Sequence, residues 1–93
     1  MEHQILRPVL VAPRLVKARR NGRATIRGTS SDAVRVLFSV AGQRGIKRTA
    51  GPPSRWIARV SKLKRPLTRV SVTAISIDGI REIRVVKVRK AKR

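Results

Sequence analysis

This chain of 93 residues carries 24 Lys or Arg against 4 Asp or Glu, which gives a formal net charge of +20. Its length suits one domain with a small core, and a hydrophobic fraction of 41% separates it from a disordered basic tail. The absence of cysteine excludes disulfides and thiol-based metal sites. No apolar run approaches the roughly 20 residues of a membrane-spanning helix. Residues 1–13 lack the pattern of a signal peptide. We therefore expect a cytoplasmic protein if the chain is complete, or one module of a longer exported protein.

Alternation of apolar and polar residues with period two predicts a series of short strands. The first is expected within residues 9–17, where Pro13 is typical of an edge strand. Further strands are predicted over residues 23–28, 33–40, 55–61, 67–76 and 80–88. The residues predicted to face the core are Ala24, Ile26, Val34, Val36, Phe38, Val40, Trp56, Ala58, Val60, Val70, Val72, Ala74, Ile83 and Val85. In the last strand, Val86 and Val88 leave the phase of the alternation ambiguous.

Turn-forming residues separate these strands at nearly even spacing. Gly, Pro, Asn and Asp gather at residues 21–22, 28–32, 42–45, 51–54, 65–66 and 78–79. No segment shows a sustained helical period. Six or seven short strands with regular turns predict an all-β fold, either a β-sandwich or a small barrel, and we favour the sandwich.

Several segments, taken in order, resemble the bacterial Ig-like module. They are residues 23–32 (RATIRGTSSD), residues 34–42 (VRVLFSVAG), Trp56 with Leu63, residues 67–74 (LTRVSVTA) and Gly79. Ser76 and Ile80 depart from the Asp and Asn of that family, and a strong basic charge is not one of its general properties.

The resemblance implies an Ig-like two-sheet antiparallel β-sandwich of about six or seven strands. Residues 1–88 would form this single domain, followed by a basic C-terminal tail over residues 89–93. One sheet would contain the first strand, the second strand and the Trp56 strand. The other would contain residues 33–40, residues 67–76 and the last strand. Alternate connections would then gather at opposite ends of the molecule.

On that fold, the basic loops and the C-terminal tail share one end, which we predict to bind a polyanion through Lys–phosphate and Arg–phosphate contacts. The residues assigned to this basic pole are Lys17, Arg19, Arg20, Arg23, Arg44, Lys47, Arg48, Lys62, Lys64, Arg65, Arg89, Lys90, Lys92 and Arg93. All four acids, Glu2, Asp32, Asp78 and Glu82, fall at or near the other end. A solvated rim that keeps the protein soluble is the alternative interpretation of the basic pole.

A second basic set, formed by Arg27, Arg55 and Arg59 with Lys17 as a candidate fourth member, is expected to face outward from the first sheet. It fits a surface that follows a phosphate backbone, and it fits protection of a sheet edge equally well. The C-terminal tail is either a basic arm that orders on a partner or an ordinary frayed terminus.

The residues for catalysis are not in place. His3 is the single His, no pair of carboxylates is set for acid–base work, and no Ser has an activating partner. We therefore predict no enzyme activity, no cofactor and no metal. Trp56 and Phe38 are predicted to be core residues and the chain has no Tyr, so base stacking has no platform.

Two functions from different classes fit these features. The first is a non-enzymatic module that binds a polyanion, with nucleic acid preferred, and contacts the backbone with little sequence discrimination. The alternative is a structural or adhesion module of a bacterial surface, envelope or virion protein that docks on an acidic partner. The sequence leaves the oligomeric state open.

Overall fold

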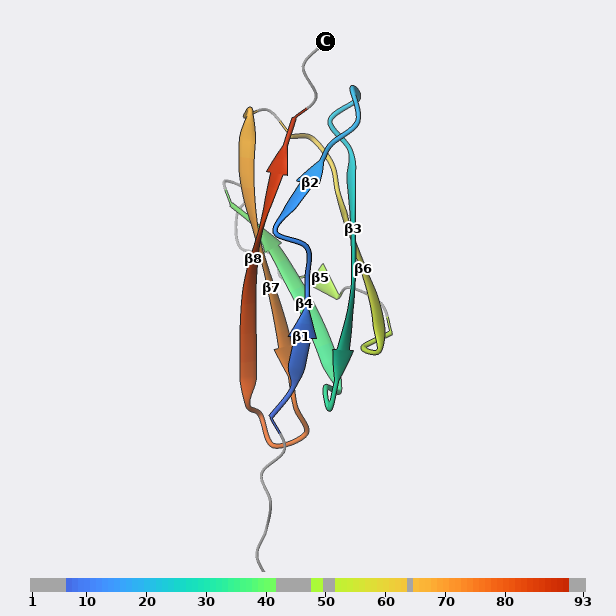
Figure 1. The fold of residues 1–93 in the computed structure, drawn as a ribbon, viewed down its shortest axis with the longest axis vertical. Coiled ribbons are helices and arrows are strands. Elements are labelled where there is room, and N and C mark those ends of the chain that lie inside the picture. Colours follow the sequence, from blue (N-terminus) through green and yellow to red (C-terminus); the bar gives the residue numbers. More distant parts are fainter. Residues whose placement is uncertain (1–6, 42–47, 50–51, 64, 91–93) are drawn as a thin grey trace, which may run out of the picture.

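The computed structural model describes residues 7–41, 48–49, 52–63 and 65–90, which form two facing β-sheets (Figure 1). The three-stranded sheet has the order β1-β3-β6, with β1 at Val9–Val11, β3 at Ala24–Ser31 and β6 at Arg55–Val60. The five-stranded sheet has the order β2-β8-β7-β4-β5, with β2 at Leu15–Lys17, β8 at Arg81–Arg89, β7 at Leu67–Ile75, β4 at Arg35–Val40 and β5 at Arg48–Thr49. The all-β class and the arrangement in two facing sheets are confirmed.

The predicted first strand is in fact two strands in different sheets. β1 pairs with β3 in the three-stranded sheet, whereas β2 runs parallel to β8 in the five-stranded sheet. Pro13 lies in the connector between them, where its missing N–H removes no ladder hydrogen bond. With this switch and the two-residue strand β5, the described residues form eight strands where about six or seven were predicted. The pairing of β2 with β8 is parallel, whereas the sandwich was predicted to be antiparallel throughout.

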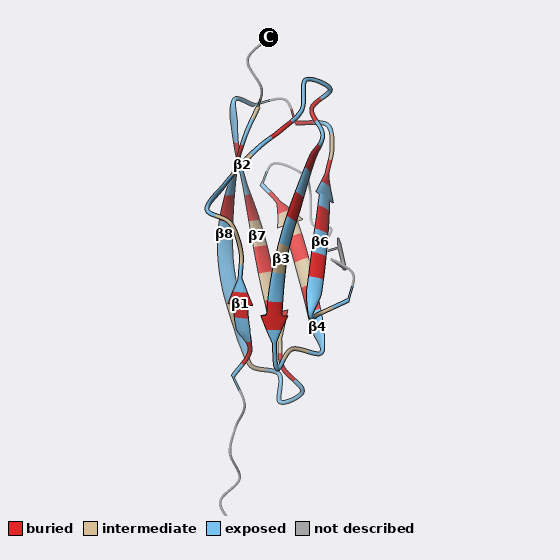
Figure 2. Cartoon of the chain, turned by 45° about the vertical axis from the view of Figure 1, so that its right-hand side comes forward, coloured by how far each residue is buried: buried red, intermediate tan, exposed pale blue. Residues whose placement is uncertain are grey.

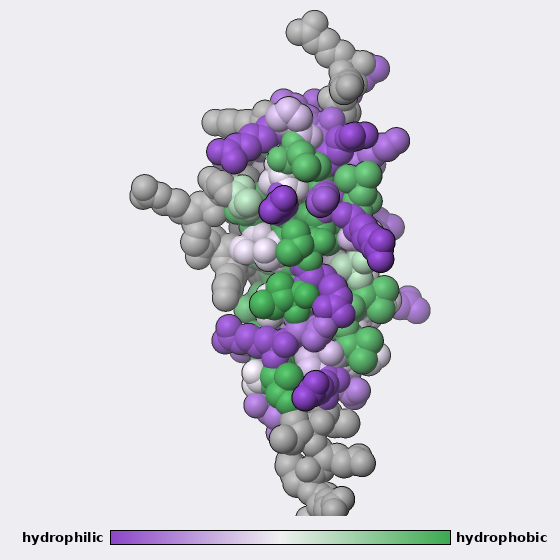
Figure 3. Space-filling model, turned by 60° about the vertical axis from the view of Figure 1, so that its left-hand side comes forward, coloured by the Kyte–Doolittle hydropathy of each residue, from purple (hydrophilic) through white to green (hydrophobic). Residues whose placement is uncertain are grey.

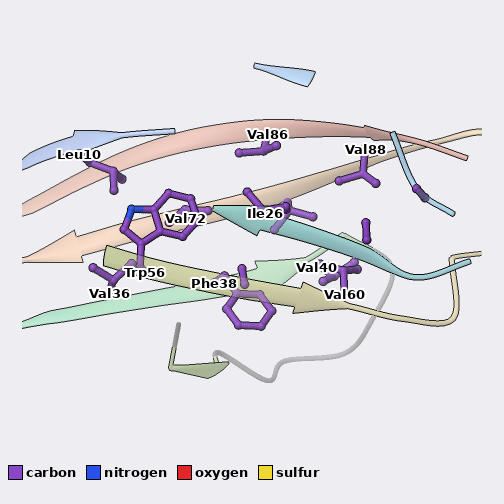
Figure 4. Close-up of a cluster of buried hydrophobic side chains, with 14 of the residues drawn as sticks. Leu10, Ile26, Val36, Phe38, Val40, Trp56, Val60, Val72, Val86 and Val88 are labelled. Atoms are coloured by element: carbon purple, nitrogen blue, oxygen red, sulfur yellow. The ribbon is translucent and has the colours of Figure 1, made fainter. Parts of the chain in front are cut away.

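Trp56 and a set of β-branched side chains fill the space between the sheets (Figure 4). The Trp56 side chain is fully buried, and its Nε1 donates a hydrogen bond to the backbone carbonyl of Thr29 at 3.2 Å. Ile26 from β3 and Val72 and Val86 from the other sheet are also fully buried. The two inner faces therefore pack against each other, as the alternation predicted for β3, β6 and β7. The colouring in Figure 2 follows this alternation along β3, β6 and β7.

Gly28 makes room for the indole of Trp56. A Cβ atom at this position would lie 2.1 Å from Cζ2 of Trp56 and 2.3 Å from the carbonyl oxygen of Val11. Gly28 pairs with Trp56 across β3 and β6, so the indole passes directly over the glycine backbone. The glycine is thus required by close packing.

The predicted phase of the last strand is wrong. Ile83 and Val85 are 56% and 51% exposed, whereas Val86 and Val88 are fully buried. The register with β7 decides this, because Val86 lies opposite the buried Val70 and directly opposed residues share a face. Alternation alone could not decide which face of β8 is buried, since β8 carries apolar residues on both faces.

The predicted inward position of Val34 is also wrong. Val34 precedes β4 and its side chain is 59% exposed, while its backbone N–H donates to the carbonyl of Ile75 at 2.8 Å. The inward alternation of β4 therefore begins at Val36, which is fully buried.

Candidate functional site

At one end of the sandwich, β2 and β8 finish and β3 and β7 begin (Figure 1), and the sequence there is rich in Lys and Arg. We call this the basic end. Its members in the described part of the chain are Lys17, Arg19, Arg20, Arg23, Lys62, Arg65, Arg89 and Lys90. All are exposed except Lys90, which is half-buried. Eight of the fourteen residues assigned to the basic pole therefore lie together, on segments far apart in the sequence.

Backbone hydrogen bonds hold these segments in place. The N–H of Leu63 donates to the carbonyl of Gly22 at 3.3 Å, which joins the loop before β3 to the loop before β7. The N–H of Lys90 donates to the carbonyl of Pro66 at 2.9 Å, and the N–H of Ala18 donates to the carbonyl of Arg89 at 2.8 Å. The basic side chains thus project from a connected backbone frame, which lowers the ordering entropy lost on binding a ligand.

The loop between β2 and β3 is a tight turn. The N–H of Gly22 donates to the carbonyl of Arg19 at 2.9 Å, and Gly22 has a φ of 75°, in the left-handed region that suits glycine. The N–H of Arg19 closes the turn onto the carbonyl of Arg23 at 2.8 Å, and the side chain of Asn21 accepts from the N–H of Arg23 at 3.0 Å. The turn brings Arg19 and Arg23 to the same side of the molecule.

A hollow of about 430 Å³ opens beside this turn. It is lined by Lys17, Arg19, Asn21, Arg23, Ala24, Thr25 and Arg27. Four of these residues are cationic, and none is acidic. A hollow with this lining offers guanidinium forks and an ammonium group to an anion, together with the neutral hydrogen-bonding groups of Asn21 and Thr25.

Arg27 connects this hollow to the second basic set. Arg27, Arg55 and Arg59 are all exposed on the outer face of the three-stranded sheet, as predicted. Arg59 lies opposite Thr25 and Arg27 lies opposite Ile57, so both lie near the hollow. Arg55 lies opposite Thr29, farther from the basic end. The sequence linked Arg27 to the basic pole only through Lys17, whereas the structure brings Arg27 to the same hollow as Lys17 and Arg23.

Two further cations, Arg69 and Lys87, were not assigned to either basic set from the sequence. They are exposed cross-strand partners on the outer face of the five-stranded sheet, one row from the pair formed by Leu67 and Arg89. Like charges directly opposite each other in a sheet are destabilising. This juxtaposition depends on the register between β7 and β8, so a spacing argument within either strand could not reveal it.

The remaining predicted residues fall into two groups. Arg48 lies in β5 opposite Phe38, beside the middle of β4, so its backbone is away from the basic end. Arg44, Lys47, Lys64, Lys92 and Arg93 lie outside the described residues.

The opposite end of the sandwich has mixed charge. Asp32 lies in the turn between β3 and β4, and Asp78 in the turn between β7 and β8, while Glu82 near the start of β8 forms an ion pair with Arg84. Glu2 lies outside the described residues. Arg35 and Arg81 flank Ile75 at this end of the five-stranded sheet. The molecule therefore contrasts a purely basic end with a mixed one, and the acids do not form a negative pole.

Within residues 7–41, 48–49, 52–63 and 65–90, no cluster of three or more His, Cys, Asp or Glu residues is placed to bind a metal ion. The same residues include no helix that is long and apolar enough to cross a membrane.

No protein-family model matches this sequence, and no curated protein matches it. Among solved structures, the crystal structure of an engineered protein is similar, with a TM-score of 0.67 and 19% sequence identity. The similarity covers 92% of this chain and 20% of that chain, so this chain spans about a fifth of the length of the engineered protein. At this identity the likeness concerns the fold alone.

Proposed function

We propose that this chain is a non-enzymatic Ig-like module that binds a polyanion, with the backbone of nucleic acid preferred, through its basic end. The observation that carries the proposal is the gathering of exposed cations around the hollow beside Arg19 and Arg23, without a described acid at that end. Such a surface repels itself in the free protein, and an anionic partner relieves the repulsion and releases counterions.

The mechanism is contact with phosphates rather than with bases. The single Trp and the single Phe are both buried and the chain has no Tyr, so base stacking has no aromatic platform. Arg19, Arg23 and Arg27 can each hold a phosphate through two parallel N–H bonds. Binding is therefore expected to depend steeply on salt and weakly on sequence.

The test is a titration of the purified protein against a labelled duplex DNA of random sequence and against heparin, at 50 mM and 200 mM salt. For about six phosphate contacts, affinity for the duplex is expected to fall about 1,000-fold between these conditions. The double variant Arg19→Glu/Arg23→Glu is expected to weaken binding at least about 100-fold. The matched control Arg35→Glu/Arg81→Glu removes the same charge from the opposite end and is expected to change affinity less than about 10-fold. Equal losses in both variants would contradict the proposal.

The second candidate is a structural or adhesion module that docks on an acidic protein surface. It is favoured by the outer face of the five-stranded sheet, where Ile83 and Val85 are more than half exposed between the cations Arg81 and Lys87. Figure 3 shows hydrophobic areas interleaved with hydrophilic ones on the surface of the molecule. An acidic partner with an apolar centre would complement this face. This candidate would be favoured if the protein bound duplex DNA and heparin with similar affinity and if Arg19→Glu/Arg23→Glu left that affinity unchanged.

A further inference from the structure

Basic residues continue from the basic end onto the outer faces of both sheets. On the three-stranded sheet, Arg27 and Arg59 are exposed in adjacent rows, Arg27 beside Ile57 and Arg59 beside Thr25. On the five-stranded sheet, Arg69 and Lys87 are exposed as cross-strand partners. The two sheets form separate layers that pack face to face (Figures 1 and 2), so the outer faces that carry these two pairs lie on opposite sides of the sandwich.

We propose that the chain binds two nucleic-acid duplexes at once, one on each outer face, and so bridges them. This inference rests on the proposed function and adds the partner's form and the number of partners bound. The face of the three-stranded sheet is defined by Arg27 and Arg59, and the face of the five-stranded sheet by Arg69 and Lys87.

Two duplexes are required because one cannot reach both faces. The backbones of facing sheets lie about 10 Å apart, and side chains extend outward from each. A single duplex would have to reverse direction around this thickness, whereas the persistence length of duplex DNA is about 150 base pairs. Straight duplexes can instead lie on each face separately, with the protein between them.

Local features make each face a separate cation site. The hollow beside Arg27 is lined by Lys17, Arg19 and Arg23, which adds cations to the three-stranded face. On the five-stranded face, Arg89 lies two residues beyond Lys87 along β8, in the next outward-facing row after the pair of Arg69 and Lys87. The described ion pair, between Glu82 and Arg84, belongs to the opposite end, so these cations are not neutralised by it.

The test uses two duplexes of unrelated sequence, one tethered to a bead and one labelled in solution. Wild-type protein is expected to capture the labelled duplex on the beads at intermediate protein concentration, and to lose capture at excess protein because each duplex then becomes saturated separately. The variants Arg55→Glu/Arg59→Glu and Arg69→Glu/Lys87→Glu remove the same charge from one face each, and neither changes a residue that lines the hollow. Each is expected to bind a single duplex within about 10-fold of wild type and to capture at least 10-fold less of the second duplex.

Three outcomes separate the inference from the proposed function. If the wild type fails to bind the tethered duplex, the proposed function falls. If the wild type binds but captures no second duplex, the bridging inference alone is overturned. If either single-face variant still bridges as the wild type does, bridging arises from self-association or from one face, and the inference is likewise overturned. Thermal melting followed by circular dichroism checks that each variant retains the fold, which exposed substitutions are expected to preserve.

Discussion

The two ends of this sandwich are built from similar turns but carry different surfaces. Each has a glycine with positive φ, Gly22 at the basic end and Gly79 at the other, and each has a non-glycine residue in the left-handed region, Lys62 and Asp32 respectively. At the opposite end Glu82 is paired with Arg84, whereas the basic end has no described acid. Similar turn conformations therefore carry a surface of balanced charge at one end and a concentrated positive charge at the other. This contrast indicates that the charge, and not the turn architecture, distinguishes the candidate site.

The largest effect is expected from removing the core that supports both ends. Trp56→Ala deletes a fully buried indole that contacts the backbone of Gly28, and large-to-small changes of this kind cost about 3–5 kcal/mol. In so small a domain this loss is expected to unfold much of the population and to abolish binding. Chemical denaturation, followed by far-UV circular dichroism because the variant lacks the Trp, measures the change in the free energy of unfolding. A stable variant with wild-type melting would contradict the packing described for Trp56.

The two turn glycines give a matched comparison of the ends. Gly79→Ala is expected to cost about 1 kcal/mol, because φ is 81° but no atom lies within 4 Å of the new Cβ. Gly22→Ala is expected to cost about 2 kcal/mol, because its φ is 75° and its Cβ would also lie 3.3 Å from the carbonyl oxygen of Leu63. Urea denaturation compares the two variants.

Binding separates these glycine variants further. Gly22→Ala shifts the loop that carries Arg19 and Arg23, so it is expected to weaken affinity for duplex DNA about 10-fold, whereas Gly79→Ala leaves affinity unchanged. Equal effects on affinity would show that the geometry of the Gly22 turn does not position the site.

The smallest effect is expected at the two non-glycine residues with positive φ. Lys62→Gly relieves a left-handed conformation and is expected to stabilise the fold by about 0.5 kcal/mol, while Asp32→Gly gains less, because Asp tolerates this region better. Lys62→Gly is also expected to make the dependence of log affinity on log salt shallower by about 1, because one phosphate contact is lost. Asp32→Gly should leave that slope unchanged. A Lys62→Gly variant that binds with the wild-type slope would remove Lys62 from the site.

The strands with clean alternation could be predicted from sequence, and the features set by pairing could not. In β6 the alternation of Arg55, Trp56 and Ile57 places the Trp inside without reference to any neighbour. In β8 both faces carry apolar residues, so the phase depends on the register with β7. The switch of sheets at Pro13 and the short strand β5 likewise depend on partners distant in sequence.

The candidate site divides in the same way. The loops of the basic end could be assigned from sequence, because turn residues and clustered Lys and Arg mark them directly. The pairing of Arg69 with Lys87 could not, since it requires the β7–β8 register. The sequence offered Lys17 as a further member of the set that contains Arg27, but the hollow that both residues share with Arg19 and Arg23 depends on where β2 ends relative to β3. Arg48 was misplaced because β5 holds its backbone opposite Phe38.

The most direct test of the basic end is the salt dependence of duplex binding for two neutralised pairs. Wild-type log affinity is expected to fall with log salt at a slope near −5, for about six phosphate contacts. Arg19→Gln/Arg23→Gln should make the slope shallower by about 2, and Arg35→Gln/Arg81→Gln should leave it unchanged. If both pairs alter the slope equally, binding follows net charge alone, and the basic end is not a site.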